Sequence, residues 1–247
     1  MRKECEKIIR KAWRDMENVL EYLEASAVSF PDKIAAKDDK KNCTYRELEA
    51  DARRAGGILT NYTEIRKPVA VFMEKGVVTL KTFMGILYAG CFYTLVDPTF
   101  PVDRIQQILS ILQTDVVVTL DEYKDKLLES GYSGQIICAE TLWNDQTEEP
   151  DQENRLEKIR QKINDTDPVY CNFTSGSTGV PKGVLICHRS IIDFIGHFTD
   201  IFHITSEDVI GNQAPFDFDV SVKDIYSALK TGATLVMIPR SFFMFPN

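Results

Sequence analysis

The sequence predicts an α/β fold in which mostly parallel sheets are flanked by helices, and two observations support it. From Pro68 onward, short apolar runs alternate with segments of helical period. Such alternation is typical of βαβ units, in which a helix returns the chain to a parallel strand. The chain has 247 residues, of which 44% are hydrophobic, enough to bury a core in one large domain or two smaller ones.

The amino-terminal part is expected to begin with a helix, a short strand and a second helix. Apolar residues at near-helical spacing up to Leu23 predict an amphipathic first helix. Residues 25–43 then hold a short strand and a charged turn at 37–41, which we interpret as a solvated hairpin tip. Thr44 stands three residues before Glu47, a capping box that would start the second helix.

The remaining elements follow the alternation. Strands are expected at 69–73, 91–96, 116–120, 135–139, 169–173, 184–187, 208–213 and 234–238. Helices are expected at 77–88, 101–112, 121–128, 154–163, 190–202 and 220–229. Because residues 141–167 are the least apolar interval, we expect a first α/β lobe over 1–140, a polar connector over 141–167 and the start of a second α/β lobe over 168–247.

The charge balance limits the classes of partner. The net charge of −8 and the isoelectric point near 5.0 argue against nucleic acid and against anionic membranes. The first seven residues are charged, and no apolar run approaches the length of a membrane span. These features predict a cytoplasmic location.

The metal-binding residue types are scattered. The six cysteines show no CxxC or Cys/His spacing, so neither structural zinc nor a disulfide framework is predicted. Four of them, Cys91, Cys138, Cys171 and Cys187, lie in apolar runs and are expected to be small buried residues.

A stretch rich in glycine and hydroxyl side chains, TSGSTGVPKG, occupies residues 174–183. Gly176 and Gly179 permit backbone conformations that bring main-chain N–H groups close to an anion. Hydroxyl groups and one ammonium add donors that suit phosphate oxygens, and they belong to Thr174, Ser175, Ser177, Thr178 and Lys182. The stretch is therefore predicted to hold a polyphosphate.

This loop differs from the Walker A template, which needs Gly-Lys-Ser/Thr at the start of a helix. Lys182 follows Pro181 and precedes Gly183, and residues 184–186 are typical of a strand. A plain glycine–serine hairpin tip is the structural alternative, because turns favour these residues for steric reasons. The order of ten residues between two apolar strands favours phosphate binding.

Four motifs, in order along the chain, resemble those of the adenylate-forming enzymes. Thr44–Leu48 resembles an early TYxEL box, 87–101 resembles a KAGxxYxPLDPxxP segment, 167–183 resembles the phosphate loop with its lead-in, and Phe218–Ser221 resembles an FDxS box. That superfamily joins acyl-CoA synthetases, luciferases, the adenylation domains of nonribosomal peptide synthetases and the D-alanine–carrier-protein ligases. The resemblance identifies the chain as the N-terminal part of the large domain of an amino-acid-adenylating member.

The resemblance implies a reaction and its cofactors. A carboxylate would attack the α-phosphorus of ATP, and the acyl group would then pass to the phosphopantetheine thiol of a carrier protein. The glycine-rich loop would hold the departing pyrophosphate, and Mg²⁺ would bridge the phosphates. Positioning and electrostatic stabilisation dominate such chemistry. The family's metal-holding glutamate and catalytic lysine fall beyond Asn247, so no catalytic residue is assigned.

The FDxS box points to the substrate. A carboxylate at Asp219, framed by Phe216, Phe218 and Val220, requires a positive partner, and the resemblance implies the α-ammonium of an amino acid. A helix N-cap or first-turn aspartate is the alternative. Lys223, four residues later, is expected to line the pocket and to neutralise Asp219 in the empty site or to select an acidic or polar side chain. A solvated lysine is the alternative there, so the amino acid itself stays open.

Later family elements are not found. The chain has no YGPTE-like or TGD box and no terminal lysine domain, and it ends in an apolar cluster at 242–246. We therefore expect an N-terminal fragment that is inactive alone and self-associates through exposed sheet edges and Phe242–Phe245. Three alternatives remain: an acyl-CoA or aryl-acid ligase of the same superfamily, an ATP hydrolase or kinase, and a non-catalytic nucleotide-binding or structural fragment.

Overall fold

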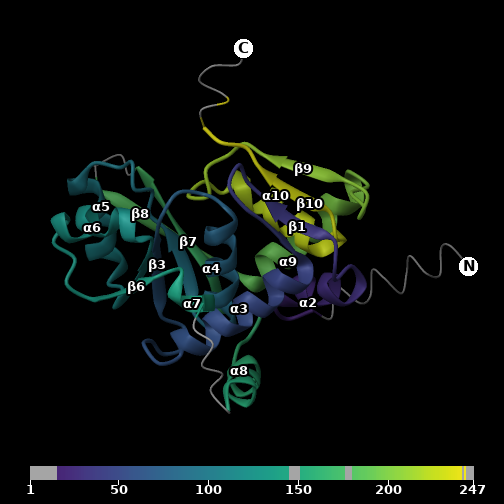
Figure 1. Cartoon of the computed structure of the whole chain (residues 1–247), viewed down its shortest axis with the longest axis horizontal. Coiled ribbons are helices and arrows are strands. Elements are labelled where there is room, and N and C mark those ends of the chain that lie inside the picture. The colour runs from purple at the N-terminus through teal and green to yellow at the C-terminus, as the bar shows by residue number, and fades with distance from the viewer. Residues whose placement is uncertain (1–15, 145–150, 176–179, 241, 243–247) are drawn as a thin grey trace, which may run out of the picture.

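Two sheets lie side by side with helices α3 and α4 between them in the computed structural model, which describes residues 16–144, 151–175, 180–240 and 242 (Figure 1). The larger sheet has six strands in the order β6-β5-β3-β4-β7-β8, and the smaller has four in the order β2-β1-β10-β9. Neighbouring strands are parallel except in the pairs β1/β2 and β7/β8. The predicted α/β class with mostly parallel sheets is therefore confirmed.

The element bounds agree with most of the predicted ranges. The larger sheet contains β3 (Pro68–Phe72), β4 (Phe92–Leu95), β5 (Val116–Thr119), β6 (Gln135–Cys138), β7 (Pro168–Ser175) and β8 (Pro181–Cys187). The smaller contains β1 (Ile34–Lys37), β2 (Asn42–Thr44), β9 (Val209–Asn212) and β10 (Thr234–Met237). The helices are α2 (Leu20–Ser29), α3 (Tyr45–Leu59), α4 (Val77–Tyr88), α5 (Val102–Leu112), the 3₁₀ turn η1 (Asp121–Tyr123), α6 (Lys124–Glu129), α7 (Thr141–Asn144), α8 (Gln152–Arg160), α9 (His188–Ile201) and α10 (Val220–Thr231).

The first described helix differs from the prediction. It begins at Leu20 and ends at Ser29, whereas residues 16–19 are not helical and residues 1–15 lie outside the described part of the chain. The buried Asn18 explains the start, because its side-chain oxygen accepts a hydrogen bond from the Leu20 N–H at 3.0 Å. Asparagine competes for backbone donors in this way and so favours helix starts over helix interiors.

Helices α3 and α4 pack closely because glycines lie at their contact. A Cβ on Gly56 would lie 2.6 Å from the Tyr88 Cβ, and a Cβ on Gly85 would lie 2.6 Å from the Ala55 Cβ. Neither distance is possible between real side chains, so glycine is required at both positions. The predicted capping box starts α3: the Thr44 hydroxyl accepts from the Glu47 N–H and the Glu47 carboxylate accepts from the Thr44 N–H, which confirms it.

Each sheet combines strands from both sides of the expected connector at 141–167. β1 pairs in parallel with β10, so that Ala36 lies opposite Leu235, and β7 joins the larger sheet beside β4. The Tyr45 hydroxyl lies 2.7 Å from the carbonyl of Ala228 and 2.6 Å from that of Ala233, which ties the start of α3 to the end of α10. A continuous core therefore runs from α2 to β10.

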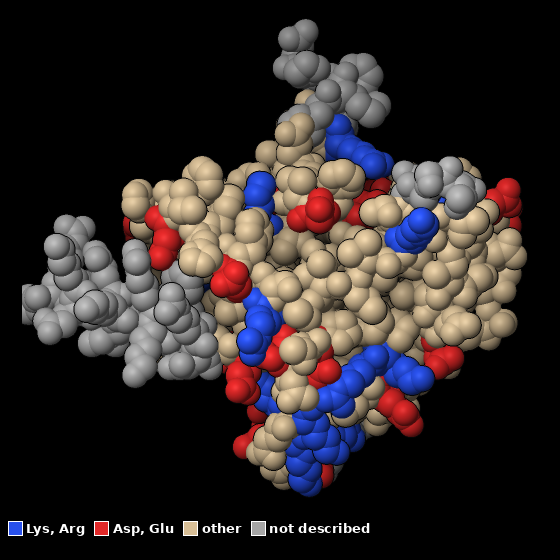
Figure 2. Space-filling view, turned by 180° about the vertical axis from the view of Figure 1, so that it is seen from behind, with Lys and Arg blue, Asp and Glu red and all other residues tan. Residues whose placement is uncertain are grey.

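The charged surface is uneven. Seen from behind, charged side chains gather at the lower end of the molecule, where α8 lies, and a broad area above them carries few (Figure 2). Within the described ranges, every helix is too short or too polar to cross a bilayer.

Candidate functional site

The glycine-rich loop connects the antiparallel strands β7 and β8. Thr174 pairs with Lys182 and Ser175 with Pro181, and the Thr174 hydroxyl donates to the Lys182 carbonyl at 3.4 Å. Gly176, Ser177, Thr178 and Gly179 lie outside the described residues. After the loop the chain continues as strand β8, as expected from the sequence and unlike a Walker A loop, whose lysine opens a helix.

The open edge of the larger sheet presents Lys182. Its side chain is exposed, and it has no ion-pair partner among the residues whose placement is described. An unpaired ammonium beside a glycine-rich connection is suited to an anionic ligand. The described flanks of the loop are thus compatible with phosphate binding.

Asp219 is the N-cap residue of α10, the position that the structural alternative expected. Its side chain is exposed and makes no capping hydrogen bond to the helix. Burial raises the pKa of Tyr170 to about 12, and the negative charge of Asp219 adds to the shift. Tyr170 lies in β7, the strand that leads to the glycine-rich loop. Tyr170 also stacks on Tyr93 with ring centroids 5.9 Å apart, and the Tyr93 hydroxyl lies 3.1 Å from that of Tyr226 in α10. The fold therefore brings α10 near the loop-bearing strand.

Lys223 pairs with a different carboxylate from the one expected. Its ammonium lies 2.5 Å from Asp224 Oδ1, and the structure shows no Lys223 contact to Asp219. Asp224 is the stronger anchor because its carboxylate is buried and held by the Asn212 amide at 3.0 Å. The expectation that Lys223 neutralises Asp219 in the empty site is therefore wrong.

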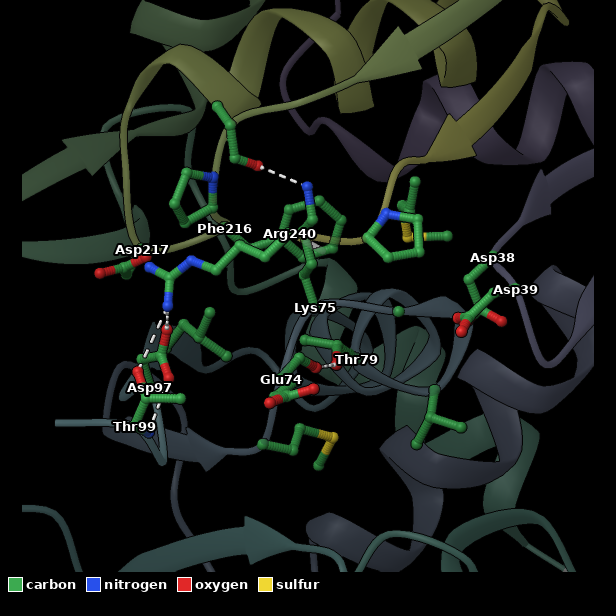
Figure 3. Close-up of a pocket in the computed structure, with 18 of the residues that line it drawn as sticks. Asp38, Asp39, Glu74, Lys75, Thr79, Asp97, Thr99, Phe216, Asp217 and Arg240 are labelled. Carbon is green, nitrogen blue, oxygen red and sulfur yellow. Dashed lines mark hydrogen bonds and ion pairs between the residues drawn. The ribbon is translucent and has the colours of Figure 1, made fainter. Parts of the chain in front are cut away.

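A cavity of about 1050 Å³ opens between the carboxyl ends of the strands of both sheets. Phe218, Val220 and Lys223 line it, whereas Asp219 is not among its lining residues. Phe216 is buried in its wall and packs against Phe83, with ring centroids 5.8 Å apart (Figure 3). Ligands of α/β proteins bind at this end of parallel strands, where loops supply polar groups.

Charged side chains that sequence reasoning missed surround this cavity. Arg240, after β10, lies 3.4 Å from the Asp97 carboxylate and 3.3 Å from the Thr99 hydroxyl, and so joins the two sheets (Figure 3). Asp217 keeps one buried carboxylate oxygen without a hydrogen-bond partner, and burial raises its pKa. Lys75 follows β3. Their positions in the sequence could have indicated a role, because each of these residues follows a parallel strand or lies in the loop after one, where ligands of α/β proteins bind.

The hairpin tip at 37–41 also contributes to the cavity. Its charged residues are largely exposed, as expected, but Asp38 accepts a hydrogen bond from the Val77 N–H at 2.7 Å and thereby caps α4. Residues 38–41 line the cavity. The tip is therefore more than a solvated turn.

The cysteines and possible metal ligands are dispersed. Cys91 and Cys171 are buried as expected, whereas Cys138 and Cys187 are only partly buried, and the described cysteines are free thiols. The described residues contain no group of three or more His, Cys, Asp or Glu side chains that could hold a metal ion.

Comparison with known proteins places these features in a family. The sequence profile of the AMP-binding enzyme family matches residues 23–246. The chain is 31% identical to tyrocidine synthase 1 of Brevibacillus parabrevis over 90% of its own length and 20% of that protein. It is also 31% identical to the D-alanine–D-alanyl carrier protein ligase of Staphylococcus aureus (strain MRSA252), over 94% of its own length and 45% of that protein.

Solved structures give the same result. The nonribosomal peptide synthetase FmoA3 superposes with a TM-score of 0.79 at 28% identity, over 90% of this chain and 23% of that one. FmoA3 in an AMPPNP-bound form superposes with a TM-score of 0.78. The chain thus spans less than half the length of these relatives, and it belongs to the AMP-binding enzyme family.

Proposed function

We propose that this chain is the N-terminal, nucleotide-binding part of an ATP-dependent ligase that adenylates an amino acid. One observation carries the proposal: α10, which follows directly on the FDxS box, is linked through Tyr93 to Tyr170 of β7, the strand that leads into the glycine-rich loop. The similar proteins include a D-alanine–D-alanyl carrier protein ligase and the nonribosomal peptide synthetase FmoA3, which supports an amino acid as the substrate.

The proposed reaction has two steps. A carboxylate oxygen of the amino acid attacks the α-phosphorus of ATP, the bond between that phosphorus and the bridging oxygen breaks, and pyrophosphate leaves. A carrier-protein thiolate then attacks the acyl carbon, and AMP leaves. The protein's task in the first step is to orient the nucleophile and to stabilise the charge of the departing pyrophosphate.

The residues that we propose for this task lie on the β7–β8 hairpin and at the start of α10. Thr174, Ser175 and Lys182, together with residues 176–179, would donate to the phosphates. Asp219 would accept from the α-ammonium of the amino acid, while Phe218, Val220 and Lys223 would contact its side chain. Binding of AMPPNP by FmoA3 supports ATP as the nucleotide.

The proposal extends to Mg²⁺, a carrier protein and a cytoplasmic location. No carboxylate cluster among the described residues fits a metal, so we assign Mg²⁺ no ligand in this chain, and the ion would bind the ATP phosphates. A carrier-protein partner is supported by the relative that is named for one.

Amino-acid-dependent exchange of pyrophosphate into ATP tests the function. We would assay the full-length protein with a panel of α-amino acids, fatty acids and aryl acids, and measure labelled ATP. Exchange driven by an amino acid and lost in Asp219→Asn supports the proposal. The control is Asp193→Asn, which changes an exposed carboxylate on α9.

The other outcomes separate the alternatives. Exchange with an aryl or fatty acid that survives Asp219→Asn identifies an acyl-CoA or aryl-acid ligase. Phosphate release that needs no carboxylic acid identifies a hydrolase. Nucleotide binding without exchange or hydrolysis in the full-length protein identifies a non-catalytic module.

We also propose that the isolated 247-residue chain self-associates. The edge strand β8 exposes Val184 and Leu185, and Phe242 is 64% exposed, whereas residues 243–245 lie outside the described part. An unpaired strand edge with apolar side chains is a template for pairing with another chain. Sedimentation velocity over a concentration series is the test, and a monomer at high concentration would contradict the proposal.

A further inference from the structure

Lys75 reaches across the cavity from the larger sheet to the smaller one. Its ammonium lies within hydrogen-bond distance of four acceptors: Asn212 O at 3.2 Å, Asn212 Oδ1 at 3.2 Å, Gln213 O at 2.8 Å and Ala214 O at 3.3 Å. An ammonium group has three hydrogens, so these acceptors use its whole donor capacity. The segment 212–214 leads through Pro215 into Phe216, Asp217 and Phe218, which line the cavity.

The turn that carries Lys75 is itself held from both sides. The Asp38 carboxylate accepts from the Val77 N–H at 2.7 Å, and the Thr79 hydroxyl donates to the Glu74 carbonyl at 2.5 Å. A Cβ at Gly76 would lie 2.9 Å from Asp38 Oδ2, so glycine permits this close approach. Lys75 therefore projects from a rigid support.

A hydrogen-bond chain continues from Lys75 to the cavity residue Lys223. The buried Asn212 accepts from Lys75 through Oδ1 and donates through Nδ2 to Asp224 Oδ2 at 3.0 Å. Asp224 Oδ1 lies 2.5 Å from the Lys223 ammonium. Because a lysine can only donate and an ionised aspartate can only accept, one orientation of the Asn212 amide satisfies both neighbours. Lys75 thus determines how Asn212 holds Asp224, and Asp224 holds Lys223.

We propose that Lys75 is a positioning residue that fixes the segment 212–220 and, through Asn212 and Asp224, the ammonium of Lys223 against the substrate side chain. The assignment of a substrate to this cavity rests on the proposed function. The positioning itself rests only on the contacts described above.

Two measurements on the full-length protein test this proposal. The first is hydrogen–deuterium exchange of the backbone amides in residues 209–223, which needs no activity. Lys75→Met keeps the length of the side chain and removes its donors, so these amides should exchange faster than in the wild type, while those of β5 and β6 stay unchanged. Unchanged exchange at 209–223 overturns the proposal.

The second measurement is steady-state pyrophosphate exchange. Lys75→Met should raise the KM for the amino acid about tenfold and leave the KM for ATP within about twofold, since the loop that contacts phosphate lies on other strands. Lys75→Arg keeps a cation with several donors and should recover part of the loss.

Lys81→Met is the matched control. Lys81 on α4 forms a largely buried ion pair with Asp51 on α3 at 2.6 Å and does not line the cavity. Lys81→Met should lower the melting temperature without changing the ratio of the KM for the amino acid to the KM for ATP. Equal KM changes in Lys75→Met and Lys81→Met would overturn the positioning role.

Failure of the proposed function would give a different result. If no amino acid drives pyrophosphate exchange in the wild type, the proposed function is rejected. The hydrogen–deuterium exchange of residues 209–223 would still decide whether Lys75 holds the segment.

Discussion

Lys223 forms its ion pair with Asp224, its neighbour in sequence, with Nζ 2.5 Å from Oδ1. Asp224 is 6% exposed and Lys223 lines the cavity, so a charge pair stands at the wall where we propose that the amino-acid side chain binds. If Lys223 turns towards a substrate group, the buried Asp224 carboxylate keeps its hydrogen bond from the Asn212 amide.

Replacement of Lys223 by Met is expected to change which amino acid drives pyrophosphate exchange in the full-length protein. The change removes the cation and its donors from the cavity wall while keeping an unbranched side chain. The measurement is the exchange rate across a panel of amino acids. Lys158→Met, at an exposed position on α8, is the control, and an unchanged profile in Lys223→Met would reject a pocket role for this lysine.

Replacement of Lys182 by Ala is expected to weaken nucleotide binding. The exposed ammonium beside the glycine-rich loop would be lost, and charge-assisted hydrogen bonds to phosphate are among the stronger polar contacts. We expect the KM for ATP to rise about tenfold or more and the KM for the amino acid to change less. Lys67→Ala, at another exposed lysine, should have neither effect, and an unaltered KM for ATP in Lys182→Ala would contradict phosphate binding.

The buried His188 makes stability depend on pH. Its Nδ1 accepts from the Val19 N–H at 3.1 Å. Burial, with a further contribution from Arg160, lowers its pKa from 6.5 to about 4, although Asp167 and Asp165 act in the opposite direction. The unfolded chain therefore binds a proton between these two values while the folded chain does not, and stability falls as the pH falls through this window.

We expect the free energy of unfolding to drop by about 2 kcal/mol through His188 between about pH 7.5 and about pH 5. Urea unfolding of the wild type and His188→Gln over this range is the measurement, and the variant should show the smaller pH dependence. The exposed His197 serves as control in His197→Gln. Equal pH dependence in the wild type and His188→Gln would contradict this assignment.

Two tyrosine hydroxyls join the larger sheet to helix α10 inside the core. The hydroxyl oxygens of Tyr93 in β4 and Tyr226 in α10 lie 3.1 Å apart, and both residues are buried. Either Tyr→Phe change leaves one buried hydroxyl without its partner and should cost about 1–3 kcal/mol of unfolding free energy. The double variant should cost less than the sum, because it leaves no orphaned hydroxyl. Additive losses would argue against a direct hydrogen bond, and Tyr62→Phe at an exposed site is the control.

Local sequence signals determined the elements. The alternation of apolar runs and helical segments predicted nearly every strand and helix after Pro68, and the Thr44–Glu47 capping box predicted the start of α3. These signals depend on residues a few positions apart, whose spacing alone decides which face is apolar and which backbone amides are capped. The composition of the ten-residue loop likewise predicted the candidate phosphate site without any information about the fold.

Only the tertiary structure decided which strands share a sheet and which charges pair. β1 joins β10 across some two hundred residues, and β7 joins β4, so the division expected near the polar connector is crossed by both sheets. Lys223 was expected to face Asp219 from helical spacing, yet it pairs with Asp224, because the buried Asn212 holds that carboxylate in place. The contacts of Asp38 with α4 and of Lys75 with residues 212–214 form only because the two sheets pack next to each other. Long-range pairing of this kind depends on how whole elements pack, and no local pattern of residues encodes it.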